Sequence, residues 1–248
     1  MILRVQVTAI GVLLAGIGGC ASPILERLSA PAARHEFFPL HPGTLWVYEV
    51  RDAQGQIALE RVLVRGPFYL KTHDTDGMIV EESGGMSGEF DLDVSWHPVV
   101  YYRRGEFLYK FSGLNDIEGE LHELPLGEGE EKVLPADPTT NREWESDFQI
   151  FHLDRHSGYG AKMVSVAKPS GESVRVRAGT FRGCLRVDSQ SDIASQPHGR
   201  AEAQVTFHYT DWYAPGVGLV KSEVRETSTA HPVSTTELIS FRDGKGSD

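Results

Sequence analysis

The chain has 248 residues, of which 35 are Asp or Glu and 24 are Lys or Arg, so its formal net charge at neutral pH is −11. A nucleic-acid-binding protein needs a basic patch or stripe, and this acidic balance argues against a nucleic-acid partner. The sequence contains only two cysteines, which excludes a disulfide-stapled scaffold. A body of roughly 210 residues can bury about 70% of its unfolded surface and needs no such staple.

The N-terminus is typical of an export signal. Arg4 provides a positive charge, and residues 7–19 form a 13-residue run whose only polar member is Thr8. A membrane-spanning helix needs about 20 apolar residues, so this run is too short and predicts a signal peptide over residues 1–19. Removing it takes away one base and no acid, which leaves the rest of the chain with a net charge of −12.

The apolar run ends in Ile17-Gly18-Gly19-Cys20. This segment resembles the lipobox of bacterial lipoproteins, which implies that Cys20 is lipidated with acyl chains such as palmitate. Several chains make membrane anchoring stable, whereas a single chain binds only marginally. Because Ala21 and Ser22 follow, with no Asp at the second position, the resemblance implies the outer membrane, with the body in the periplasm. The alternative is an ordinary cleaved signal with a chance cysteine.

The rest of the chain divides into three parts. Residues 20–36 are rich in small residues, prolines and charges, which predicts a flexible, lipidated tether. Residues 37–242 are predicted to form one antiparallel β-domain. Residues 243–248 are predicted to be a disordered tail.

Three segments of the body resemble poorly characterised exported bacterial proteins of the TapB-like, domain-of-unknown-function kind. The first is the opening over residues 37–50, with its Phe-Pro-Leu, Pro-Gly, Trp and Tyr. The others are Val-Arg-Ala-Gly-Thr-Phe, followed by Cys184, and Tyr-Ala-Pro-Gly-Val-Gly-Leu-Val-Lys from Tyr213. The resemblance implies a β-rich envelope protein and supplies no catalytic residue.

Alternating apolar and polar residues, punctuated by glycine and proline, predict antiparallel strands along the body, most clearly over residues 173–226. Residues 99–103 and 106–111 are typical of a hairpin around Arg104-Gly105. Residues 115–131 carry seven acids and no Lys or Arg, which predicts a long solvated crossing. No segment shows a sustained period of 3.6 residues, so any helix should be minor.

The expected fold is therefore all-β, with a single curved antiparallel sheet or partly open barrel of about ten to twelve strands. Such a sheet is expected to cup a hydrophobic cavity, as in lipoprotein carriers of the cell envelope. A two-sheet sandwich is the alternative.

Metal sites are weakly indicated, and no metal or other cofactor is predicted. His152 and His156 have the spacing of zinc ligands on a helix, but the surrounding residues indicate a strand. On a strand, residues four apart lie about 13 Å from each other, too far to share one metal. Residues 74–77 resemble the start of a calcium loop but lack its later acid.

Cys184 is the remaining candidate for nucleophilic chemistry, with His208 or His198 as its base. If Cys20 carries lipid, Cys184 has no intrachain disulfide partner. Strand alternation would place it beside two arginines, which favour a thiolate, whereas a bulge at Gly183 would return it to the core. The motif context of a cysteine enzyme is absent, and we expect no enzymatic activity.

Four arginines and two aromatic residues are the predicted ligand or partner surface. The guanidinium groups could bind phosphate or carboxylate groups, or could instead pair with Glu172, Asp188 and Glu202 across the sheet. The Trp-Tyr-Ala-Pro-Gly turn is expected to form an exposed aromatic lip. The predicted surface consists of Arg175, Arg177, Arg182, Arg186, Trp212 and Tyr213.

Two classes of function remain. The first is a non-catalytic, membrane-anchored envelope lipoprotein whose β-cup holds an acyl chain or another apolar ligand. The second is a structural or accessory protein that contacts another envelope protein through exposed strands. The expected partners are the membrane, through the N-terminal lipid, and either an apolar ligand or an envelope protein.

Overall fold

Alternation of buried and exposed side chains explains why the body folds as strands, as along Leu45–Asp52. The computed structural model describes residues 37–86, 96–117, 120–123, 129–137, 141–152, 157–195 and 203–245. Within these ranges it contains fourteen strands and no helix. The strands are β1 (Leu45–Asp52), β2 (Ile57–Leu70), β3 (Thr75–Met86), β4 (Trp96–Arg104), β5 (Phe107–Phe111), β6 (Leu114–Ile117), β7 (Glu120–Glu123), β8 (Glu130–Pro135), β9 (Arg142–His152), β10 (Ser157–Val176), β11 (Gly179–Ser195), β12 (Ala203–Ala214), β13 (Gly218–Glu226) and β14 (Ser234–Arg242).

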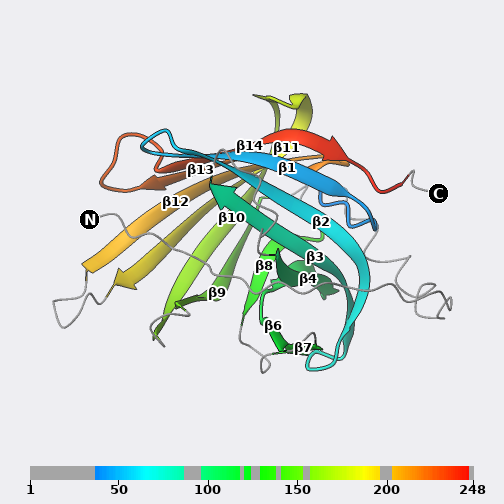
Figure 1. Cartoon of the computed structure of the whole chain (residues 1–248). Coiled ribbons are helices and arrows are strands. Elements are labelled where there is room, and N and C mark those ends of the chain that lie inside the picture. The colour runs from blue at the N-terminus through cyan, green and yellow to red at the C-terminus, as the bar shows by residue number, and fades with distance from the viewer. Residues whose placement is uncertain are drawn as a thin grey trace.

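Twelve of these strands form one antiparallel sheet in the order β8-β5-β4-β3-β2-β1-β14-β13-β12-β11-β10-β9. The first strand of the body pairs with the last, β1 with β14, so the two ends of the body meet in the middle of the sheet. The sheet curls into a nearly closed barrel (Figure 1). The prediction of a single curved sheet or partly open barrel is confirmed. The sandwich alternative and the minor helix are not seen in the described residues.

The barrel closes imperfectly where β8 meets β9, and we call this junction the seam. The backbone N–H of Lys132 on β8 donates to Ser146 Oγ at 2.9 Å, and its carbonyl accepts from Trp144 Nε1 at 3.1 Å. The Lys132 ammonium group also donates to the carbonyl of Glu145 at 3.1 Å. Side chains of β9 thus form the hydrogen bonds of the Lys132 backbone groups. In a completely closed barrel, backbone groups of the neighbouring strand would form them.

One end of the barrel interior is filled by apolar side chains. Phe38, which precedes β1, lies against Trp46 and Tyr101 with ring centroids 5.8 and 4.8 Å apart. Trp46 is 1% exposed, and its indole N–H donates to the carbonyl of Val217 in the β12–β13 turn. We call this region the apolar end. It consists of Phe38, Leu40, Trp46, Val64, Leu134, Leu185, Val220 and Leu238, all buried.

Gly218 shows why glycine is needed beside Trp46. Its φ is +101°, a left-handed conformation that side chains disfavour, and a Cβ added there would lie 3.2 Å from Trp46 Nε1. The Gly-Val-Gly segment is therefore a turn fitted to the indole.

A second apolar cluster lies on the outer side of the sheet, against the β6–β7 hairpin. It includes Tyr102, Tyr109 and Phe111. The β4–β5 hairpin places Phe107, Tyr109 and Phe111 on one face, as predicted, because its register pairs Arg104 with Phe107 and Tyr102 with Tyr109.

The expected solvated crossing over residues 115–131 is corrected for the described part of this segment, which contributes to β6, β7 and β8. Two of its acids accept specific hydrogen bonds. Glu123 accepts from the backbone N–H groups of Lys71 and Thr72 at 2.9 and 2.7 Å. Glu130 accepts from the hydroxyl of Tyr102. These partners lie far away in sequence, which is why the acidic composition alone suggested solvent.

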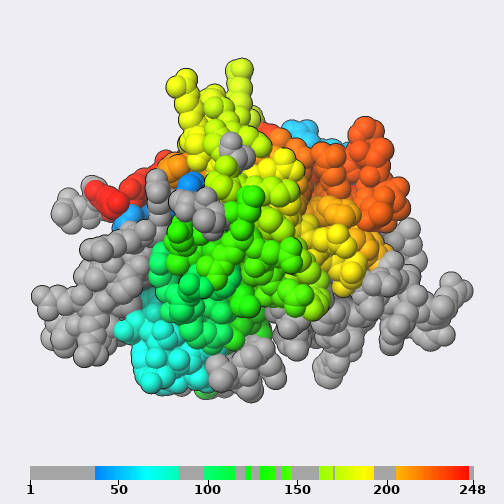
Figure 2. All heavy atoms as spheres, turned by 180° about the vertical axis from the view of Figure 1, so that it is seen from behind, coloured from blue at the N-terminus to red at the C-terminus, as the bar shows by residue number. Residues whose placement is uncertain are grey.

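The β10–β11 hairpin projects from the body, as the space-filling view shows (Figure 2). At its tip, the N–H of Ala178 donates to the carbonyl of Leu238 on β14 at 3.0 Å. Further along, the register between the two strands shifts near Glu172, and Gly183 has a φ of +68°. This bulge turns Cys184 into the core, where it is 1% exposed. Of the two possibilities that the sequence left open for Cys184, the structure shows the return to the core.

Candidate ligand-binding cavity

A cavity of about 210 Å³ lies inside the barrel along the seam, and we call it the seam cavity. Strands β8 to β12 line it, so it spans both sides of the junction between β8 and β9. Its lining is Glu131, Lys132, Val133, Trp144, Met163, Ser165, Val187, Ser189, Tyr209, Asp211 and Tyr213. The lining is mainly apolar, in keeping with the expected hydrophobic cavity, and it also contains carboxylate and hydroxyl groups.

The strand registers explain why these side chains face the same space. Ser165 pairs with Trp144 on one side and Ser189 on the other. On the next ladder, Val187 pairs with Asp211. Directly paired residues lie on the same face of a sheet. Because one residue of each pair faces the interior, its partner on the neighbouring strand faces the interior as well.

Asp211 is the most perturbed carboxyl group in the cavity. Burial raises its pKa to about 6, and the nearby charge of Glu131 contributes to this rise, while a hydrogen bond from Ser222 opposes it. Asp211 is therefore largely ionised at neutral pH although it lies inside the barrel.

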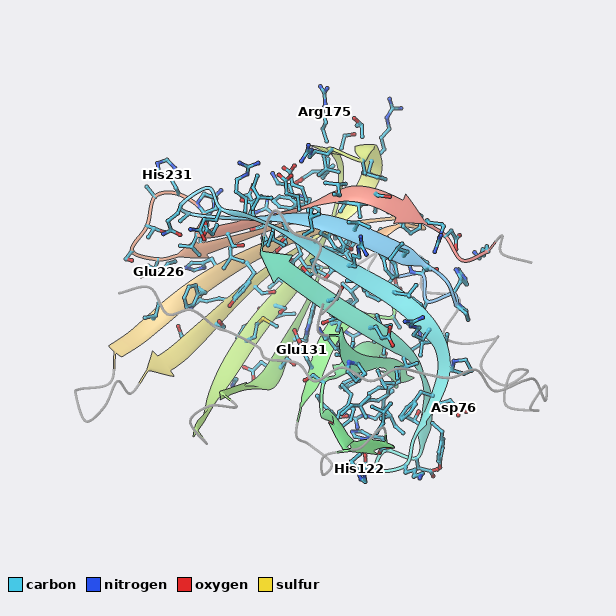
Figure 3. All side chains as sticks on the ribbon, viewed as in Figure 1. Asp76, His122, Glu131, Arg175, Glu226 and His231 are labelled. Atoms are coloured by element: carbon cyan, nitrogen blue, oxygen red, sulfur yellow. The ribbon has the colours of Figure 1, made fainter. Side chains whose placement is uncertain are left out.

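Glu131 approaches the cavity from β8, and Figure 3 shows its side chain at the middle of the molecule. Burial raises the pKa of Glu131, Lys110 lowers it and Glu82 raises it. Lys110 is the register partner of Glu131, but its ammonium group binds Glu82 Oε2 at 2.8 Å. Burial and Glu82 also raise the pKa of Glu60. We call Glu60, Glu82, Glu131 and Asp211 the inner carboxylates.

Tyrosine side chains complete this polar part of the interior. Burial holds the pKa of Tyr48, Tyr101 and Tyr213 well above its ordinary value, so their hydroxyls stay protonated. The Tyr101 hydroxyl donates to Glu82 at 3.3 Å, and that of Tyr48 donates to the carbonyl of Leu219 at 3.1 Å. The interior thus combines carboxylates, hydroxyl groups and aromatic rings.

The predicted arginine surface does not form one site. Arg186 donates to Asp188 Oδ1 at 2.8 Å and lies 4.0 Å from Glu172, as the carboxylate-pairing alternative anticipates. Arg175 and Arg182 are exposed, and Figure 3 shows Arg175 on the projecting hairpin. The third predicted carboxylate partner, Glu202, lies outside the described residues.

Arg177 borders a hollow of about 560 Å³ on the outer face. The hollow is larger than the seam cavity, but its two arginines are already occupied. Arg51 donates to Glu49 Oε1 at 2.8 Å, and Arg177 donates to Glu49 Oε2. Glu49 and Glu237 also line the hollow, and these two carboxylates offset the two guanidinium groups. The hollow therefore offers little positive charge to an anionic ligand, and the seam cavity is the better candidate site.

Trp212 and Tyr213 point in opposite directions. Trp212 is half-buried on the outer face, where its indole N–H donates to Glu172 Oε2 at 2.9 Å. Tyr213 is 7% exposed and lines the seam cavity. The prediction of an exposed aromatic lip is wrong, because adjacent strand residues alternate between faces and the following turn is packed on Trp46.

Cys184 is a buried thiol. Burial raises its pKa, and its Sγ lies 3.7 Å from the carbonyl oxygen of Phe181. His208 pairs with Gln190, six residues from Cys184 along β11, or roughly 20 Å at the spacing of a strand. The Cys184–His208 dyad is therefore not formed, and His198 lies outside the described residues.

The remaining candidates give no metal centre in the described part of the chain. No group of three or more His, Cys, Asp or Glu side chains there could hold a metal ion. Asp74 lies in the β2–β3 turn and accepts a hydrogen bond from Tyr69. His156 and the His152 side chain, like the predicted signal peptide, Cys20 and the predicted tether, lie outside the described residues. Among the described residues, no helix is long and apolar enough to cross a membrane.

The inner carboxylates were missed by the sequence predictions, although one signal was present. The inward-facing series on β12 is Val205, Phe207, Tyr209, Asp211 and Tyr213, with one acid among apolar and aromatic residues. An acid on the core face of an alternating strand indicates a functional or paired group. Glu131 carried no such signal, because it sits within a generally acidic run.

Comparisons with known proteins support the fold. Residues 167–238 match the DUF3108-like family model, which spans the end of β10 to Leu238 of β14. No curated protein matches the chain significantly. The crystal structure of a "putative lipoprotein" from Parabacteroides distasonis aligns with a TM-score of 0.51 and 19% identity, covering 84% of this chain and 99% of that one.

A "putative exported protein with YmcC-like fold" from Bacteroides fragilis aligns with a TM-score of 0.45 and 14% identity, over 84% of this chain and 99% of its own. The match to a domain-of-unknown-function family agrees with the broad resemblance in the sequence, while the finer TapB-like resemblance stays a prediction. The chain shares the fold of the Parabacteroides protein and, over residues 167–238, the features of the DUF3108-like family.

Proposed function

We propose that this protein is a non-catalytic lipoprotein of the bacterial cell envelope that binds an acyl chain or another amphiphile in its seam cavity. The export signal and the lipobox at Cys20 support the membrane anchor. The structurally similar Parabacteroides protein, itself named as a lipoprotein, is in keeping with this assignment. The sorting residues after Cys20 favour the outer membrane, with the barrel in the periplasm.

The observation that carries the ligand proposal is the seam cavity itself. The cavity is a concave pocket of about 210 Å³ that is partly open to solvent, which is the form that most small-molecule binding sites take. Pockets for drug-sized ligands are about 300–1,000 Å³. The seam cavity therefore suits one short chain or a small amphiphile, and a complete two-chain lipid would require the barrel to widen.

The lining fits an amphiphile. Trp144, Met163 and Val187 provide apolar surface, while Glu131 and Asp211 provide carboxylates, and the register sets Val187 directly beside Asp211. Trp144 is held in place by its hydrogen bond to Lys132, so its ring is a fixed part of the wall. We therefore extend the predicted apolar ligand to one with a polar head group.

A catalytic role is not part of the proposal. The buried thiol of Cys184 has a raised pKa, which disfavours the reactive thiolate. The arginines Arg177 and Arg186 are engaged with carboxylates, which argues against a phosphate-handling centre built on them.

The seam also favours a second candidate, an accessory protein that pairs with an envelope partner. Strands β8 and β9 end the sheet, and an extended segment could add to such an edge by β-augmentation. That segment would have to displace the bonds of Ser146 and Trp144 to Lys132. Because these bonds already satisfy the edge, we favour the ligand-binding function.

Native mass spectrometry of the protein, extracted without added lipid, tests the main proposal. We expect a copurifying small amphiphile that is lost when the cavity is filled by Ser165→Phe. Gln190→Ala is the matched control, because Gln190 is an exposed residue of β11 that does not line the seam cavity. This control should keep the ligand. A parent chain that is free of any ligand would contradict the carrier function.

The membrane anchor is tested separately with Cys20→Ser. We expect the wild-type chain to incorporate labelled palmitate and to fractionate with outer membranes, and the variant to lose both properties. Unchanged membrane fractionation of the variant would exclude a lipid anchor at Cys20.

A further inference from the structure

We propose that the seam cavity selects amphiphiles with a protonated amine head group, which lies between Glu131 and Asp211. This inference rests on the proposed ligand-binding function and specifies the class of ligand. It follows from the charges, contacts and size of the seam cavity.

The first observation is the charge balance inside the barrel. In the part of the chain that the structure describes, the inner carboxylates share the interior with cations as well: the ammonium group of Lys110, which is bound to Glu82, and the guanidinium group of Arg103, whose register partner Leu108 belongs to the interior cluster. Lys132 also lines the seam cavity, but its ammonium group donates to the Glu145 carbonyl and lies 5.5 Å from the ring of Phe107. The four inner carboxylates therefore outnumber these three cations, and the interior keeps an excess of negative charge.

The second observation is that Glu131 has no ion-pair or hydrogen-bond partner among the residues that the structure describes. It is half-buried and lines the seam cavity; burial raises its pKa, and Lys110, its neighbour across the ladder, lowers it. Asp211 accepts a hydrogen bond from Ser222 and has no cationic partner in the same described part of the chain. A partly buried carboxylate that forms no ion pair is unfavourable, and a bound cation offsets that cost.

The third observation is the position of the aromatic rings. Tyr209 and Tyr213 flank Asp211 along β12 and line the seam cavity with it. Aromatic faces attract ammonium groups as well as apolar chains. An amine can therefore bind the carboxylates while its carbon chain contacts Trp144 and Met163.

An organic cation fits this site better than a metal ion. Within the described ranges no three His, Cys, Asp or Glu side chains are close enough to hold a metal. Calcium takes six to eight oxygen ligands, which two carboxylates and their neighbours do not provide. The apolar half of the lining would also be unused by a bare ion.

The test compares three ligands that share an eight-carbon chain and differ in their head group: octylammonium, octanol and octanoate. Each is titrated by calorimetry at neutral pH into the full chain carrying Cys20→Ser, which removes the lipid. We expect octylammonium to bind about tenfold or more tightly than octanol, and octanoate to bind most weakly, because charge-assisted hydrogen bonds contribute about 1.5–3 kcal/mol.

The carboxylates are tested with Glu131→Gln and Asp211→Asn. Each variant is expected to lower the affinity for octylammonium about tenfold and to leave that for octanol unchanged. The matched control is Glu145→Gln, which removes an exposed carboxylate of β9 that pairs with Lys162. We expect this control to bind all three ligands as the parent chain does.

The outcomes separate this inference from the function on which it rests. Equal or tighter binding of octanol or octanoate would overturn the amine selectivity and leave the ligand-binding function intact. Binding of none of the three, together with ligand-free protein in mass spectrometry, would overturn both. An effect of Glu145→Gln as large as that of Asp211→Asn would assign the selectivity to overall charge. If the cavity variants do not fold, the selectivity of the parent chain among the three ligands decides.

Discussion

The apolar end and the seam cavity are two regions of one barrel interior with opposite character. At the apolar end, Trp46 and Phe38 fill the space, and the indole N–H is satisfied by Val217. At the seam cavity, Glu131 and Asp211 face unfilled volume. The comparison indicates that the apolar end stabilises the fold, whereas the seam cavity is less stabilising and is available for binding.

The strand ends explain how one sheet supports both regions. The β12–β13 turn and the segment before β1 bring backbone and aromatic groups to the apolar end. The seam cavity lies instead where the sheet closes through the side chains of Ser146 and Trp144. Incomplete closure leaves both space and polar groups, which a continuous ladder would have removed.

The largest expected effect is at the apolar end. Trp46→Ala removes a fully buried indole and its hydrogen bond, and should lower the free energy of unfolding by about 3 to 5 kcal/mol. Urea denaturation measures the change. Tyr69→Ala is the control, because Tyr69 is 46% exposed, and a loss at Trp46 no larger than at Tyr69 would contradict the role of the apolar end.

In the seam cavity, a substitution is expected to raise the free energy of unfolding rather than lower it. The folded-state pKa of Asp211 is about 6 and its unfolded value is about 3.9, so the folded chain binds the proton more tightly. Its contribution to stability is therefore greatest below about pH 4 and declines as pH rises through about 6. Asp211→Asn should stabilise the protein at pH 7 by about 1 to 2 kcal/mol, after allowance for solvent screening, and much less at pH 4.

Asp188 provides the contrasting control for Asp211. Burial alone would raise the pKa of Asp188, but bonds from Lys168 and Arg186 hold it below its ordinary value. Its stabilising contribution is present near neutral pH and is lost as pH falls through that lowered pKa. Asp188→Asn should thus destabilise the protein at pH 7. Denaturation curves at pH 4 and 7 that show the same sign for both variants would refute this contrast.

An intermediate effect is expected at the seam. Ser146→Ala removes the acceptor of the Lys132 N–H and should cost about 1 kcal/mol. Hydrogen exchange of the Lys132 amide should quicken, because the seam opens more easily. Ser228→Ala, in an exposed turn, should change neither quantity. Slow exchange at Lys132 in the Ser146 variant would mean that another group protects this amide.

The smallest effect is expected on the outer surface. Replacing Arg177 and Arg182 by Gln should change stability by less than about 1 kcal/mol, because both guanidinium groups are exposed and Arg51 still pairs with the buried Glu49. Binding of inorganic phosphate should be equally weak in the parent and the variant. A clear loss of phosphate binding would restore the arginine cluster as a candidate site in place of the seam cavity.

Local patterns predicted the parts of the fold that depend on local physics. The β4–β5 hairpin follows from the Arg104-Gly105 turn and its alternating flanks. The burial of Cys184 follows from a bulge at Gly183, which the sequence offered as one of two possibilities. Both features depend on residues within a few positions of one another.

The candidate site was predicted poorly because it depends on distant residues. Glu131 and Asp211 are separated by much of the chain and meet only when β8 and β12 line the same cavity. Trp212 and Tyr213 were grouped as one surface, whereas strand alternation separates neighbours by face. The acids of residues 115–131 were assigned to solvent because their partners, such as Thr72, lie elsewhere.

The amino-acid sequence by itself determined that the body is built of antiparallel strands, where several of them turn, and how its charge is balanced. Only the tertiary structure decided which strands end the sheet, which end of the interior is filled and which carboxylates share a cavity. The physical reason is that alternation defines two faces for every strand. The closure of the sheet, and the register of strands that are distant in sequence, then decide which side chains on those faces meet.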